Sequence, residues 1–96
     1  MLQEHYPNRL CFLRKRNHLS QKQVAALIGP RDRTMISKYE RGHVQPQFSV
    51  AAKFQIVFGA RIEDIFPEEY KRFQREVDQV RENKLRNRAV QFQEHI

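Results

Sequence analysis

Residues 32–40 gather the side chains of this 96-residue chain that are best suited to specific hydrogen bonding. A helix over this segment would place four cationic and hydroxyl side chains on one face, away from Ile36 and Tyr39. These four are Arg33, Thr34, Ser37 and Lys38. Arg donates two parallel hydrogen bonds to guanine, Thr bonds a base edge or touches a thymine methyl group, and Lys reaches guanine or phosphate. The segment is therefore a candidate for direct contact with nucleic-acid bases.

The residue types that support catalysis or metal binding lack the necessary spacing. Cys11 falls on the partly inward face of a predicted helix, where Cys usually acts as a small hydrophobe. The histidines are scattered along the chain, at His5, His18, His43 and His95. No Gly-rich phosphate loop and no nucleophile beside a base is found. We therefore expect no catalytic residue, no metal, no cofactor and no enzyme activity.

Basic residues concentrate in the first half of the chain. Between Arg9 and Arg41, nine basic residues stand against two acidic ones, so this stretch alone carries the net charge of +7. Residues 68–96 hold seven basic and six acidic side chains. A basic half beside a nearly neutral half fits a polyanion-binding domain with an appended interaction helix, although ordinary solubilising charge is the alternative.

Length and hydropathy predict one small cytoplasmic domain. No run approaches the roughly 20 apolar residues that span a bilayer, and the first residues lack the apolar core of a signal peptide. A lone Cys11 cannot form an internal disulfide. We expect no membrane partner, and the fold must depend on its hydrophobic core.

Periodicity and capping residues predict only helices. The first covers about residues 7–17, and the second starts after Ser20, whose capping box with Gln23 precedes the apolar residues Val24, Ala25, Leu27 and Ile28. The second helix stops at Gly29-Pro30; Asp32 caps a third that runs to Glu40 and is ended by Gly42. A fourth, apolar helix covers 46–58, and a final short turn or helix covers 60–66. The fold class is therefore all-α.

The order of these motifs resembles the phage-repressor and Cro-like (XRE-type) helix-turn-helix family over roughly residues 9–67. The resemblance is carried by Leu13-Arg14, Leu19-Ser20-Gln21, Val24-Ala25, Ile28-Gly29, Ile36-Ser37, Tyr39-Glu40-Arg41-Gly42, Pro46 and Ile62-Glu63-Asp64-Ile65-Phe66. It implies a five-helix, lambda-repressor-like DNA-binding domain. In that family the third helix enters the major groove and the second lies across the DNA backbone.

The resemblance also implies roles for individual residues. Those matching base-reading positions are Arg33, Thr34 and Lys38. Those assigned to the DNA backbone are Gln21, Lys22, Arg31, Ser37, Arg41 and His43. Arg14 and Glu40 match a structural ion pair between the first and third helices. For Arg33 the plain alternative is a solvated arginine that pairs with Asp32.

The sequence departs from the family pattern at two places. The segment Gly29 to Arg33 holds one residue more than the usual turn, so Arg31 could take over part of the role given to Arg33. Gln55 stands where a small core residue is usual. Ile56, beside it, falls on a face that should be exposed, so either the fourth helix is slightly rotated or Val50 and Ile56 are covered by another segment.

The tail predicts one more helix, beginning at Pro67. Its apolar residues follow a coiled-coil spacing from Phe66 through Tyr70, Phe73 and Val77 to Val80, and then shift by one position at Leu85. We therefore divide the chain into a helix-turn-helix domain, 1–67, and a mixed-charge C-terminal helix, 68–96. This helix packs on the domain, pairs with a second copy or binds another protein; a solvated, partly frayed helix is the alternative.

Two functions fit these features. The first is a sequence-specific double-stranded DNA-binding transcriptional regulator, acting as a homodimer on a pseudo-palindromic operator with residues 32–40 in the major groove. The second is the antitoxin of a toxin–antitoxin pair, in which residues 68–96 bind a protein toxin while the domain regulates its own promoter. A toxin-sized protein that co-purifies at fixed stoichiometry would favour the second.

Overall fold

The computed structural model describes the backbone of residues 6–29 and 32–95, with side chains as far as Asn87. Six helices are present among these residues, and no strand. They are α1 Leu10–Arg16, α2 Gln21–Ile28, α3 Arg33–Glu40, α4 Phe48–Phe58, α5 Ile62–Ile65 and α6 Pro67–His95. The predicted all-α, lambda-repressor-like class is confirmed. No described helix is long and apolar enough to cross a membrane.

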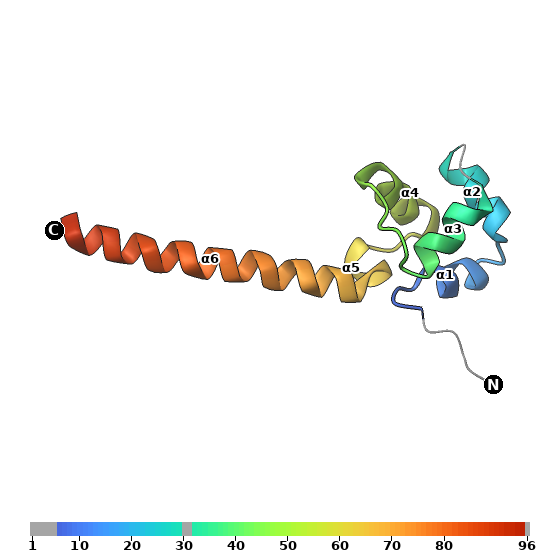
Figure 1. The fold of residues 1–96 in the computed structure, drawn as a ribbon. Coiled ribbons are helices and arrows are strands. Elements are labelled where there is room, and N and C mark those ends of the chain that lie inside the picture. Colours follow the sequence, from blue (N-terminus) through green and yellow to red (C-terminus); the bar gives the residue numbers. More distant parts are fainter. Residues whose placement is uncertain (1–5, 30–31, 96) are drawn as a thin grey trace, which may run out of the picture.

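The first five helices pack around one aromatic centre, and α6 leaves this body as a single rod (Figure 1). Phe54 of α4 is 1% exposed, and its ring centroid lies 5.9 Å from that of Tyr39, 6.1 Å from Phe58 and 6.3 Å from Phe66. Leucine, valine and isoleucine side chains from α1, α2, α3 and α5 complete the core. The rod extends the molecule to 63 Å along its longest axis.

Capping residues set the helix boundaries where we expected them at α2 and α3. The Ser20 hydroxyl accepts a hydrogen bond from the Gln23 backbone N–H at 3.0 Å, and the Gln23 side chain accepts one from the Ser20 N–H at 2.8 Å. Asp32 accepts from the Met35 backbone N–H at 3.1 Å. The predicted capping box and the predicted N-cap of α3 are therefore confirmed.

Other boundaries differ from those predicted. α1 begins at Leu10 rather than near residue 7, because the Asn8 side chain accepts from the Leu10 N–H and keeps the preceding chain outside the helix. α4 begins at Phe48, two residues after the predicted start. α5 covers only Ile62–Ile65, and the Gln55 side chain accepts from the Ile62 backbone N–H at 2.9 Å at its first turn.

Apolar residues of α2 and α4 differ in their burial. Leu27, one of the apolar residues that follow the capping box, is 58% exposed. Val50 belongs to the core at 3% exposure, whereas Ile56 on α4 is 80% exposed and is covered by no described segment. Tyr70, Phe73, Val77 and Val80 form an apolar stripe on α6 that is 39–54% exposed, so this helix does not fold back onto the domain (Figure 1).

Candidate nucleic-acid interface

α2 and α3 pack closely against each other, and one face of α3 lies against the core. Ile36, Tyr39 and Glu40 are the buried residues of α3. Arg33, Thr34 and Lys38 lie on its exposed face, with Ser37 half-buried at the edge. Thr34 and Lys38 are neighbours on this surface because they are four positions apart, as are Arg33 and Ser37, so the two pairs lie side by side on the helix. The exposed face therefore presents two cations and a hydroxyl together.

The buried carboxylate of Glu40 joins three helices at the inner side of α3. Its Oε2 accepts from Arg14 Nε at 2.6 Å, and its Oε1 accepts from Arg14 Nη2 and from Gln21 Nε2, each at 3.2 Å. Arg14 also donates through Nη1 to the Leu19 carbonyl at 3.1 Å. The hydrogen bond to Glu40 raises the pKa of Arg14, so the guanidinium keeps its charge. The ion pair fixes α1, α2 and α3 relative to one another.

Beside this ion pair lies a surface hollow of about 350 Å³ at the start of α2. It is lined by Arg14, Ser20, Gln21, Lys22 and Arg33. The hollow thus brings the first turn of α2 next to the first turn of α3. An anion there would meet cationic side chains and the positive end of a helix dipole.

The remaining candidate residues lie at the two ends of α3. Arg41 and His43 are exposed just beyond its C-terminal end. Arg31, in the turn before α3, falls outside the described residues. The suggested pairing of Arg33 with Asp32 is not formed within the described part of the chain, where Asp32 serves instead as the N-cap of α3. In the same part of the chain, no group of His, Cys, Asp and Glu side chains is arranged to hold a metal.

Two polar side chains support this arrangement although sequence reasoning did not identify them. Asn8 is 7% exposed and donates to the Tyr39 carbonyl at 2.8 Å, near the end of α3. Lys53 of α4 donates to the Ile28 carbonyl at 2.9 Å, at the end of α2. Both bonds join residues more than 20 positions apart, so no local pattern could indicate them.

Comparison with known proteins agrees with this geometry. A helix-turn-helix family model matches residues 12–65, the stretch that contains α2, α3 and their supporting helices. An uncharacterized HTH-type transcriptional regulator of Methanocaldococcus jannaschii is 36% identical over 59 residues, which cover 62% of this chain and 88% of that protein. The chain therefore belongs to the helix-turn-helix family of DNA-binding regulators, in agreement with the resemblance noted from its sequence.

Proposed function

We propose that this protein is a sequence-specific double-stranded DNA-binding transcriptional regulator that inserts α3 into the major groove. The observation that carries the proposal is the outward face of α3. Arg33, Thr34 and Lys38 are exposed there, while the opposite face is fixed in the core. A major groove about 12 Å wide accepts a helix, and these side chains can bond base edges within it.

The proposed contacts divide between bases and backbone. Arg33, Thr34 and Lys38 read bases, because they lie on the exposed face of α3. The backbone contacts are assigned to the surrounding residues Gln21, Lys22, Arg31, Ser37, Arg41 and His43. In this assignment a phosphate occupies the hollow at the start of α2, where Lys22 and the first-turn N–H groups meet it.

We further propose that the regulator acts as a homodimer on a pseudo-palindromic operator. Half-sites one helical turn apart, about 10 base pairs, match two copies of α3 related by a two-fold axis. In this proposal residues 1–67 bind DNA and residues 68–96 make the protein contacts. The exposed apolar stripe of α6 supports a role in protein contacts.

Selection of duplex DNA from a random pool at roughly 150 mM salt tests this function directly, because non-specific binding is strongly suppressed at that salt concentration. Enrichment of a two-fold symmetric motif is the expected result. Binding that enriches no sequence and vanishes as salt rises would mean that the basic surface recognises only polyanions, and would refute the proposal.

The exposed stripe on α6 also favours a second candidate, the antitoxin of a toxin–antitoxin pair. In that case residues 68–96 would bind and mask a protein toxin while the domain regulates its own promoter. A toxin-sized protein that co-purifies at fixed stoichiometry and is lost on truncation after Pro67 would support it. A homodimer that carries no further protein would exclude it.

A further inference from the structure

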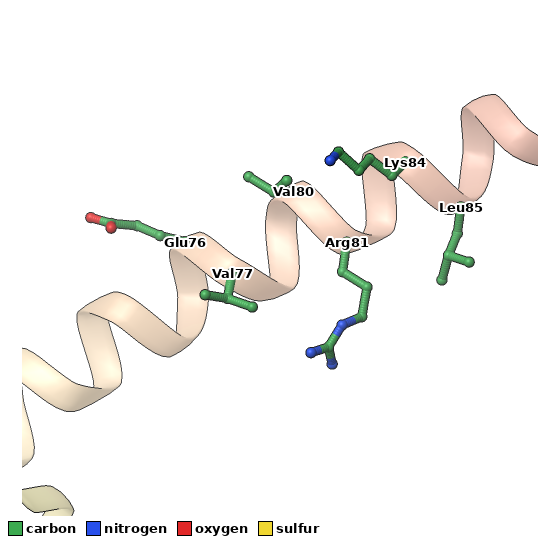
Figure 2. Close-up of a pocket in the computed structure, with 6 residues that line it drawn as sticks. All are labelled: Glu76, Val77, Val80, Arg81, Lys84 and Leu85. Carbon is green, nitrogen blue, oxygen red and sulfur yellow. The ribbon is translucent and has the colours of Figure 1, made fainter.

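α6 exposes an apolar stripe that no other described part of the chain covers. Tyr70, Phe73, Val77 and Val80 are 39%, 43%, 53% and 54% exposed and follow one another at intervals of three and four residues. Figure 2 shows that Val77 and Val80 lie on successive turns, with Glu76 and Arg81 close by. These intervals are those of the core positions of a coiled coil, where a second helix covers the stripe.

The charges beside the stripe select the direction of that second helix. With the four apolar residues at the core positions, Glu76 and Arg81 occupy the two flanking positions. In a parallel pair, the flanking Glu76 of each copy faces Arg81 of the other, which gives two interchain ion pairs. In an antiparallel pair that stacks Val77 on Val80, Glu76 faces Asn83 and Arg81 faces Gln74, so neither charge meets an opposite charge on the other chain, and Arg81 keeps only its pair with Asp78 of its own chain.

We propose that two copies of this protein pair in parallel through residues 70–80 of α6. Parallel pairing places both helix-turn-helix domains at the same end of the rods, where both copies of α3 can reach one duplex. This inference rests on the proposed function only in one respect, because the regulator proposed above uses a symmetric dimer. The pairing itself requires no DNA.

The sequence also limits how far the pairing runs. The next two core positions are Lys84 and Asn87, and in a parallel pair the two Lys84 side chains would face each other. At the other end, Tyr70 and Phe73 also line an apolar groove of about 230 Å³ together with Phe48 of α4. The contact surface therefore extends toward the domain rather than toward the end of the tail.

Two heptads bury less than a standard stable interface of about 800 Å² per partner, so we expect a weak dimer that operator DNA strengthens.

Single cysteine variants of the full chain test the direction of pairing. In a parallel pair, Val77→Cys and Val80→Cys each lie opposite their own copy, so both variants form interchain disulfides under mild oxidation. An antiparallel pair can bring at most one of these positions within the roughly 7 Å between Cα atoms that a disulfide allows. Arg75→Cys, on the outer side of α6, is the matched control and should cross-link much more slowly; the native Cys11 is buried. Cross-linking of only one variant, or of neither beyond the control, would overturn the proposal.

A charge exchange without added cysteine gives an independent readout. Glu76→Lys places like charges opposite each other at two sites, and sedimentation without DNA should show a dimer dissociation constant raised by about ten-fold. Adding Arg81→Glu to the same chain should restore the original value, whereas Glu82→Lys on the outer face should leave it unchanged. A monomer at all concentrations, or no effect of Glu76→Lys, would refute the pairing. Because these experiments contain no DNA, their failure is separate from a failure of the operator selection.

Discussion

Removing the charge of Glu40 should strongly destabilise the fold. Glu40 is 2% exposed, and its carboxylate accepts three hydrogen bonds, two from Arg14 and one from Gln21. In Glu40→Gln the shape persists, but the Arg14 guanidinium, 12% exposed, loses its counter-charge. Breaking a buried ion pair in this way costs about 3–5 kcal/mol. For a domain of this size, that loss lowers the melting temperature by at least about 12 °C.

Replacing both partners together should be far milder than removing one. Arg14→Met with Glu40→Leu leaves no uncompensated charge, and we expect a stability within about 1 kcal/mol of the original, since apolar pairs often substitute for buried ion pairs without loss. Urea unfolding followed by circular dichroism measures both values. Glu82→Gln is the control, because Glu82 pairs with Arg86 on the surface and contributes under about 0.5 kcal/mol. A Glu40→Gln protein as stable as the control, or a double variant as unstable as the single one, would refute the reasoning.

Three further experiments test other features of the structure. Arg33→Ala should cost about 1–3 kcal/mol of operator binding and relax preference at one base position, whereas Lys22→Ala should weaken all sequences alike and lower the salt slope by about one; identical behaviour of the two variants in binding titrations would contradict the assigned register of α3. Gly42→Ala should destabilise by about 1 kcal/mol more than Gly59→Ala in thermal unfolding, because both glycines have positive φ but an added Cβ at Gly42 would lie 2.6 Å from a proline ring carbon, whereas at Gly59 it meets open space. Burial raises the pKa of the Glu69 carboxyl above 4.5, so the folded state binds that proton more tightly and the free energy of unfolding falls as pH rises from about 4.5 towards the raised pKa. Glu69→Gln should reduce this fall by under about 1 kcal/mol. A pH profile of stability that the variant leaves unchanged would contradict the prediction.

The features that sequence reasoning predicted are those set by neighbouring residues. Ser20 and Asp32 begin α2 and α3 by bonding backbone groups three residues away, so their roles are visible in the sequence itself. The ion pair of Arg14 with Glu40 spans 26 positions, and it was expected only because a family resemblance supplied it.

Features that depend on tertiary contacts could not be predicted in this way. Asn8 lies near the carbonyl of Tyr39 only after α1 and α3 have packed, so no local pattern indicates a start of α1 as late as residue 10. Val50 and Ile56 are both apolar residues of α4, yet packing buries the first and leaves the second 80% exposed. The sequence left open whether the helix is rotated or both residues are covered, and the hydrogen bond from the Ile62 N–H to the Gln55 side chain shows that Gln55 faces α5.

The way α3 is held bears on the extra residue in the turn that precedes it. The core anchors of this helix, Ile36, Tyr39 and Glu40, all follow its first turn, and Asn8 bonds the carbonyl of Tyr39 near its end. The first turn itself is set by the cap that Asp32 forms with Met35. The buried residues determine the rotation of α3 about its axis. Arg33 and Thr34 therefore stay on the exposed face whatever the length of the preceding turn. Changes between α2 and α3 should therefore alter contacts near the start of α3 without moving the face that we propose reads DNA.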